Sequence, residues 1–167
     1  DFQEPIVLGS ASMAGHWGLS RLIVFYDSNN AQISGKVDRS DSSNYAQIFE
    51  GFGWHVLEID GHNHEEIREA LEKAQVVDRP SLIIGTTIMA KGSATMEGDH
   101  ETHGAPLPQD EINQTKEKLG LPIKSFYLPN EVISHFQKRF SDLKEKVNNW
   151  NESVTKSCSD ESFKSLW

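Results

Sequence analysis

Short apolar runs alternate with segments of helical spacing along the first two thirds of the chain. Three runs rich in β-branched and aromatic residues favour strands, and they cover residues 22–26, 54–59 and 81–87. Apolar residues at helical intervals, or small residues with an apolar stripe, predict helices over residues 5–19, 45–50 and 64–74. Because strands and helices alternate, we expect an α/β fold, a parallel sheet with helices on both faces. The run at 22–26 is typical of a strand buried on both sides.

The last third of the chain has a different pattern. A helix is predicted from residue 109 to about 119, where Gly120 and Pro122 stop it. Apolar residues recur at helical spacing from Val132 to Val147 and predict a second helix through about Trp150. Residues 151–167 are rich in Ser, Lys and acids, so we interpret them as a linker that follows one domain at residues 1–150.

Composition and charge exclude several classes of protein. The 16 basic and 25 acidic residues give a formal net charge of −9, which argues against nucleic acid or an acidic membrane as a partner. A polyanionic ligand would therefore need a helix N-terminus, backbone amides or a divalent cation. Cys158 is the single cysteine, so an intrachain disulfide is impossible. With no apolar run of membrane-spanning length and no leader-like start, we expect a cytoplasmic protein.

Oxygen-bearing side chains follow the first predicted strand directly. The sequence there is Asp27-Ser28-Asn29-Asn30. In open α/β sheets ligands bind beyond the carboxyl ends of strands, and Asp, Asn and backbone carbonyls supply the oxygens that hard cations prefer. The same residue types also dominate ordinary polar turns, and the spacing alone leaves both interpretations open.

Histidines occur in two places where a site could be built. The loop at residues 88–104 is long for a compact domain and ends near His103, and an imidazole can donate to a phosphoryl oxygen or transfer a proton near neutral pH. His55, His62 and His64 lack the spacing of a tetrahedral metal site, so we interpret them as surface histidines.

Several fragments, taken in order, give the chain a family resemblance. They are residues 12–19, 22–35, 51–56, 79–83, 91–93 and 100–107, the last ending in His-Gly-Ala-Pro-Leu. Together they resemble the cofactor-binding domain of transketolases, from residue 1 to about residue 151. The resemblance implies a thiamine diphosphate-binding fold that uses Mg²⁺ or Ca²⁺. It also implies transfer of a two-carbon ketol unit from a ketose phosphate to an aldose phosphate in the pentose phosphate pathway.

The same resemblance assigns candidate site residues. It implies that the Asn29 side-chain oxygen and the Ala31 backbone carbonyl bind the metal ion, and through it the cofactor. Met89 matches an apolar position against the cofactor. His103 matches a histidine near the diphosphate and the reacting centre, so it is both a cofactor-binding and a catalytic candidate. Transketolases are homodimers with the active site at the subunit interface, and Glu4 matches an acid there.

Two departures from the family pattern leave alternatives open. Transketolases carry a Gly-Asp-Gly triplet, whose Asp is a metal ligand, just before a segment like this one, and Asp1 falls after that triplet. We therefore expect a fragment that is incomplete at its N-terminus. The resemblance also implies that residues 151–167 lead toward a pyrimidine-binding domain that this chain does not contain, so we expect the fragment to be inactive by itself. Gly9 stands where the family often has a glutamate. Two alternatives stay open. The chain could come from a sister enzyme of the dihydroxyacetone synthase or deoxyxylulose phosphate synthase type, or it could be a non-catalytic binding or assembly remnant.

Overall fold

The computed structural model describes residues 2–167, so Asp1 lies outside the described residues. The chain divides into two compact units, one up to Leu121 and one from Pro122 to Trp167. We describe each unit by itself.

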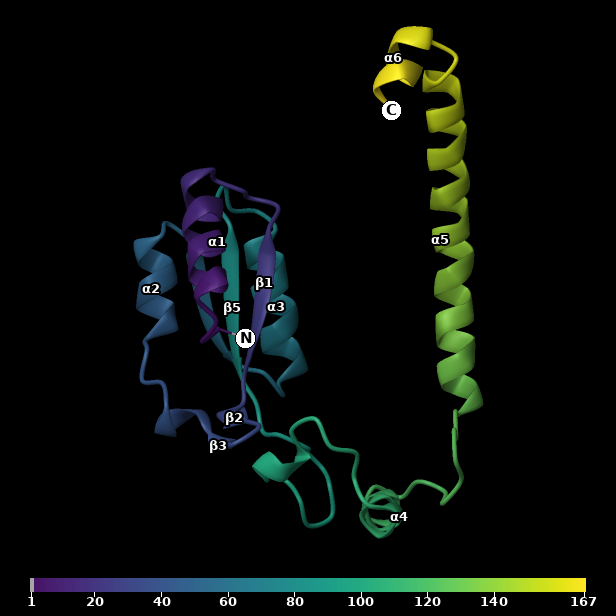
Figure 1. The fold of residues 1–167 in the computed structure, drawn as a ribbon. Helices are drawn as coiled ribbons and strands as arrows, with labels where there is room; N and C mark the ends of the chain where they lie inside the picture. The colour runs from purple at the N-terminus through teal and green to yellow at the C-terminus, as the bar shows by residue number, and fades with distance from the viewer. Residues whose placement is uncertain (1) are drawn as a thin grey trace. The chain divides into compact units, whose positions relative to one another are not determined.

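A parallel sheet of three strands forms the centre of the first unit (Figure 1). The order is β1 (Ile23–Ser28), β5 (Ser81–Thr86), β4 (His55–Asp60), with Asp27 opposite Gly85 and Asp60 opposite Thr86. The central strand β5 is buried from Ser81 to Gly85. The expectation that the first strand is buried on both sides is wrong, because β1 lies at an edge of this sheet and Phe25 is 42% exposed.

Helices cover both faces of the sheet, which confirms the predicted α/β architecture. Successive side chains of a strand point to opposite faces, so Leu82 and Ile84 of β5 meet one layer and Ile83 the other. The first layer consists of α1 (Pro5–His16) and α2 (Tyr45–Gly51), and the second is α3 (His64–Ala74). The Trp54 indole donates to the Ala11 carbonyl at 2.8 Å, which ties the residue just before β4 to α1 within the buried core.

The helix boundaries follow local capping chemistry. Helix α1 begins with Pro5, where the missing N–H costs nothing, and ends at His16, three residues before the predicted 19 and two before Gly18, whose φ is 60°. Helix α3 has the predicted bounds because Asn63 accepts hydrogen bonds from the amides of Glu65 and Glu66. Helix α4 (Gln109–Lys118) closes the first unit.

Small elements gather at the carboxyl end of β1. The strands β2 (Ala31–Gln32) and β3 (Gly35–Lys36) form an antiparallel hairpin, and the short 3-10 helix η1 (Val37–Arg39) follows it (Figure 1). The predicted long loop at 88–104 is irregular apart from one 3-10 turn, η2 (His100–Thr102). These segments provide the surroundings of the site.

The second unit is more helical than the sequence pattern indicated. Helix α5 (Asn130–Ser157) continues past the predicted end at Trp150, and α6 (Glu161–Leu166) follows it. The Ser-rich segment is helical because Asp160 caps α6 and because Trp167 packs its ring against Phe163 and Trp150. Whether residues 151–167 link two domains stays a prediction. Within residues 2–167, α5 and every other helix fall short of the combined length and apolarity that crossing a bilayer requires.

Candidate functional site

A pocket of about 910 Å³ opens beyond the carboxyl end of β1. The end of β1, the β2–β3 hairpin and the segment before α1 line it together with Met89 and His103. Asn29, Ala31, Met89 and His103 are far apart in the sequence, and all of them line this pocket. The structure thus brings the predicted site residues together, while their roles stay predictions.

The side chain of Asn29 is held in one orientation. Its amide nitrogen donates to the Asp27 carboxylate at 3.0 Å, and its oxygen accepts from the Ala31 amide at 2.9 Å. Thr87, which follows β5, also donates to Asp27 through its hydroxyl. Because an ionised carboxylate only accepts, Asp27 fixes which end of the Asn29 amide carries the oxygen.

The bond from Ala31 to Asn29 also belongs to an ordinary Asx turn, so the turn interpretation of this segment is correct, whereas the metal-site interpretation stays a prediction. Asn30 has φ of 54°, a left-handed conformation that Asn tolerates. Its side-chain oxygen accepts from the Asp38 amide at 3.2 Å, and its carbonyl accepts from the Val37 amide. These bonds hold the loop between β1 and β2 against η1.

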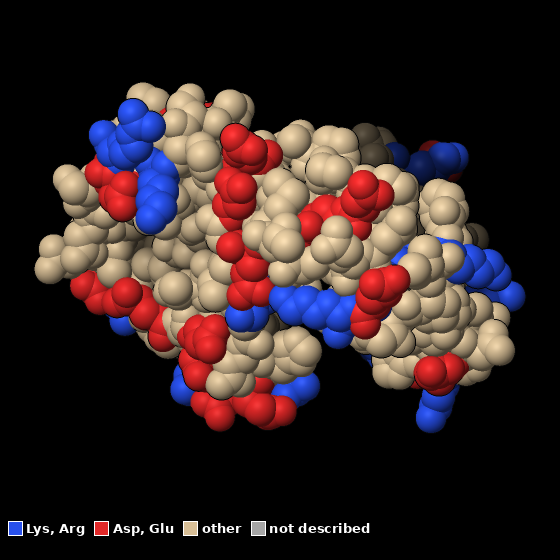
Figure 2. All heavy atoms as spheres, turned by 90° about the horizontal axis from the view of Figure 1, so that it is seen from below, with Lys and Arg blue, Asp and Glu red and all other residues tan. Residues whose placement is uncertain are grey.

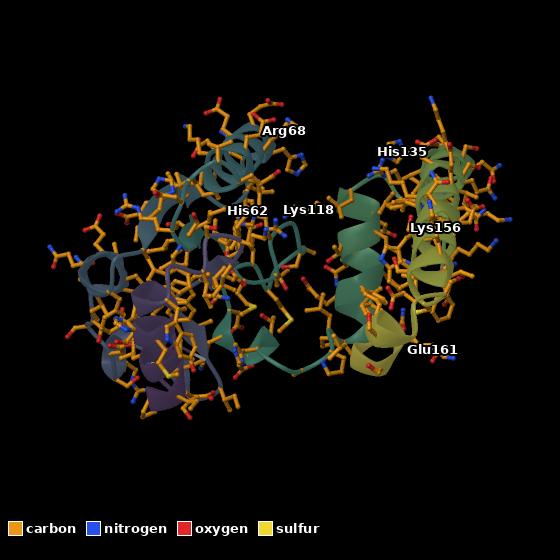
Figure 3. All side chains as sticks on the ribbon, turned by 90° about the horizontal axis from the view of Figure 1, so that it is seen from above. His62, Arg68, Lys118, His135, Lys156 and Glu161 are labelled. Atoms are coloured by element: carbon orange, nitrogen blue, oxygen red, sulfur yellow. The ribbon has the colours of Figure 1, made fainter. Side chains whose placement is uncertain are left out.

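The loop that bears Met89 and His103 begins at a histidine contact that the sequence did not reveal. His62 (Figure 3), which we interpreted as a surface histidine, accepts the Ile88 amide on its Nε2 at 2.8 Å. Along the loop, the Met89 carbonyl accepts from the Gly98 amide at 2.8 Å, and the His103 amide donates to His100. Among residues 2–167, no three His, Cys, Asp or Glu side chains are arranged to hold a metal ion. His62 therefore supports the loop and joins no metal cluster of that kind.

The charge of the pocket decides which ligands fit. Its lining carries the carboxylates of Glu4 and Asp27, and none of the described lining residues is Lys or Arg. Figure 2, which shows the molecule from below, has acidic side chains at several separate places with basic ones beside some of them. The described part of the lining therefore offers no Lys or Arg side chain that could neutralise an anionic ligand. The Asn29 amide oxygen retains a lone pair, and with the Ala31 carbonyl it matches the oxygen ligands of Mg²⁺ or Ca²⁺.

A second polar pocket of about 450 Å³ shares Tyr26, Asn30 and Val37 with the first. Within it the Tyr45 hydroxyl donates to Asp41 at 2.5 Å. Hydrogen bonds from Ser43 and Tyr45 lower the pKa of Asp41 to about 2, and burial followed by the Asp41 bond raises the pKa of Tyr45. Near neutral pH neither group changes protonation, so this pair holds the loop before α2 and does not transfer protons.

Comparison with protein families shows which family the chain belongs to. Residues 1–165 match the family described as transketolase, thiamine diphosphate binding domain. The transketolase of Bacillus subtilis is 42% identical over 160 residues, which are 93% of this chain and 24% of that protein. Transketolase 1 of Escherichia coli is 41% identical over 144 residues, 84% of this chain and 21% of that protein. The chain thus spans less than a quarter of the length of these curated relatives.

Solved structures show the same similarity. The transketolase of Campylobacter jejuni aligns with a TM-score of 0.88 and 39% identity, covering 99% of this chain and 26% of that one. A transketolase variant from Pichia stipitis, solved in complex with fructose-6-phosphate, aligns with a TM-score of 0.86 and 30% identity, covering 99% of this chain and 24% of that one. From its residues and its fold, this chain belongs to the transketolase family and corresponds to that family's thiamine diphosphate-binding domain.

Proposed function

We propose that this chain binds the diphosphate of thiamine diphosphate, together with Mg²⁺ or Ca²⁺, in the pocket beyond β1. The observation that carries the proposal is the convergence of Asn29, Ala31, Met89 and His103 on one pocket. The lack of Lys and Arg among its described lining residues supports a role for the cation.

Each residue has a distinct task in this proposal. The Asn29 side-chain oxygen and the Ala31 carbonyl bind the cation, which neutralises the diphosphate. His103 donates a hydrogen bond to a phosphoryl oxygen and is the candidate for proton transfer beside the reacting centre. Met89 gives the cofactor an apolar surface, which suits a polarisable and flexible side chain.

For the whole protein we propose a transketolase that moves a two-carbon ketol unit from a ketose phosphate to an aldose phosphate. Bound thiamine diphosphate supplies the carbon chemistry of this transfer. We further propose that the protein is a cytoplasmic homodimer of the pentose phosphate pathway, with its active site at the subunit interface. The isolated chain is expected to bind without catalysing the transfer.

Calorimetric titration of thiamine diphosphate into the chain tests the proposal, with Mg²⁺ and with EDTA. We expect binding with Mg²⁺, none with EDTA, and an affinity at least about tenfold lower in Asn29→Ala, since one metal ligand is lost. Asn148→Ala is the matched control, because Asn148 is exposed on α5 and lies outside the pocket lining. Equal binding by Asn29→Ala and the wild-type chain would refute the metal site, and absence of any binding by the wild-type chain would refute the proposed function.

A further inference from the structure

One face of α4 binds the backbone of the loop at residues 93–96. Glu111, Thr115 and Lys118 lie four and three positions apart, so they share that face. The Thr115 hydroxyl accepts the Ala94 amide at 3.0 Å, and the Lys118 ammonium donates to the Ser93 carbonyl at 2.7 Å (Figure 3 labels Lys118). A helix outside the pocket lining thus holds the tip of the loop that enters it.

Glu111 is the centre of this contact. It is only 5% exposed, and its Oε1 accepts the Thr95 amide at 2.8 Å and the Met96 amide at 3.3 Å. Its Oε2 accepts the Thr95 hydroxyl at 2.7 Å. A buried carboxylate with three hydrogen-bond donors holds the loop firmly, because removal of its oxygens leaves two loop amides without their partner.

The loop tip, residues 93–96, is connected to the pocket through Met89 and Gly98. The Gly98 amide donates to the Met89 carbonyl at 2.8 Å, so the two ends of the segment 90–97 lie side by side. We call the Met89–Gly98 pair the neck of the loop. Within the segment 90–97, Glu97 accepts from the Gly92 amide at 2.9 Å and from Lys91 at 3.2 Å. One end of the neck is Met89, and the other leads through η2 to His103.

We propose that Glu111 is a positioning residue for the pocket: by fixing the loop tip at Thr95 and Met96, it sets where Met89 and His103 stand. This inference rests on the proposed function, in which those two residues face thiamine diphosphate. Helix α4 is then part of the cofactor-binding machinery although it does not touch the cofactor. Thr95 and Met96 lie 16 and 15 residues before Glu111, so local sequence patterns do not predict this contact.

The variants Glu111→Ala and Glu111→Gln test whether Glu111 positions the loop or only supports folding. Alanine removes every acceptor, whereas Gln keeps the Oε1 that receives both loop amides and offers an N–H to the Thr95 hydroxyl oxygen. Thr115→Val is a second variant, since it removes the acceptor of the Ala94 amide with little change of volume. Glu117→Ala on the same helix is the matched control, because Glu117 is exposed and its side chain forms none of the described contacts with the loop.

The first measurement is amide hydrogen exchange at Gly98 in the chain without cofactor, at constant pH. We expect exchange at Gly98 to quicken about tenfold in Glu111→Ala, because the loss of a buried acceptor releases the tip and the neck with it. Glu111→Gln and Glu117→Ala should stay within about threefold of the wild-type rate. The second measurement is the dissociation constant for thiamine diphosphate with Mg²⁺, which should rise about tenfold in Glu111→Ala and return in Glu111→Gln.

The two measurements distinguish failure of this inference from failure of the proposed function. Faster exchange at Thr95 with an unchanged rate at Gly98 overturns the inference, because the contact would then be local. If Glu111→Ala does not fold, Thr115→Val decides in the same way, by a faster or an unchanged rate at Gly98. If the wild-type chain binds no cofactor, the proposed function fails, and exchange at Gly98 still decides whether Glu111 positions the neck.

Discussion

At the scale of single residues, Asp27 orients the side-chain amide of Asn29, which we propose as a metal ligand. The Asn29 amide can present either an oxygen or a nitrogen, and the Asp27 carboxylate binds the nitrogen at 3.0 Å. An amide nitrogen cannot bind a metal ion in this state, so the orientation is as important as the residue type. Family resemblance identified Asn29, whereas the task of Asp27 is visible only in the hydrogen bonds.

Asp27→Asn should therefore weaken Mg²⁺-dependent binding of thiamine diphosphate by about tenfold, since a bond to a charged acceptor is lost and the Asn29 amide is free to turn over. Calorimetry with and without Mg²⁺ measures this change. Asp38→Asn is the matched control, because Asp38 lies in η1 and contacts Asn30 instead of Asn29. An unchanged affinity in Asp27→Asn would show that Asn29 holds its orientation without the carboxylate.

At the scale of elements, alanine substitutions at two glycines of α1 should change the free energy of unfolding in opposite directions. A Cβ at Gly15 would lie 1.9 Å from the Phe52 carbonyl oxygen, which is backbone and cannot move aside, so α1 packs on the end of α2 only through glycine. Gly15→Ala should lower the free energy of unfolding by about 2 kcal/mol or more. A Cβ at Gly9 meets nothing within 4 Å, so Gly9→Ala should raise it by about 0.5 to 1 kcal/mol.

Urea unfolding of the two alanine variants measures both changes at the same temperature. The pair is internally controlled, since the substitution and the helix are the same. Equal effects of the two substitutions would mean that α1 does not pack against Phe52 as described.

The loop between β5 and α4 should loosen in acid. Hydrogen bonds from the Thr95 amide and hydroxyl lower the pKa of Glu111 below its ordinary value of 4.5, and the Gly92 amide and Lys91 do the same for Glu97. A carboxylate with a lowered pKa in the folded state contributes stability above the unfolded-state value. That contribution is lost as the pH falls through the folded-state pKa.

We expect the protection factor of the Thr95 amide to be constant from neutral pH to about pH 5 and to fall below pH 4.5, as measured by hydrogen exchange. Glu111→Gln should remove that part of the fall which comes from Glu111, because Gln does not titrate. Protection that falls equally in both proteins would assign the acid effect to Glu97 or to the fold as a whole.

Sequence patterns predicted the helices and strands better than the strand order and the contacts between distant residues. Helix α3 was found with its bounds because Asn63 and the apolar stripe are local signals. The edge position of β1 was missed, since pairing order depends on residues far apart. The four candidate site residues came from family resemblance, whereas His62 and Glu111, which hold the loop, were not recognised because their partners lie 26 and 15 to 16 residues away.

At the scale of the whole molecule, the boundary between compact units differs from the domain boundary that composition indicated. Along the chain, the first unit ends at Leu121 and the second begins at Pro122, and residues near 150 lie inside α5. Between α4 and α5 the chain has no regular helix or strand. There Gly120 and Phe126 have positive φ, and the Phe126 side chain is fully exposed. Backbone of this kind is easily bound in the extended form that proteases require.

Brief digestion with chymotrypsin should therefore cut first after Phe126 or Tyr127, because both aromatic side chains are exposed outside regular structure. Mass spectrometry of the early products identifies the bond, and the expected pair of fragments ends at residue 126 or 127 and begins at the next residue. The double variant Phe126→Ser and Tyr127→Ser should slow the first cut, whereas Phe140→Ser within α5 should not. A first cut near residue 150 would instead place the flexible boundary where the Ser- and Lys-rich composition indicated it, and α5 would then be open there in solution.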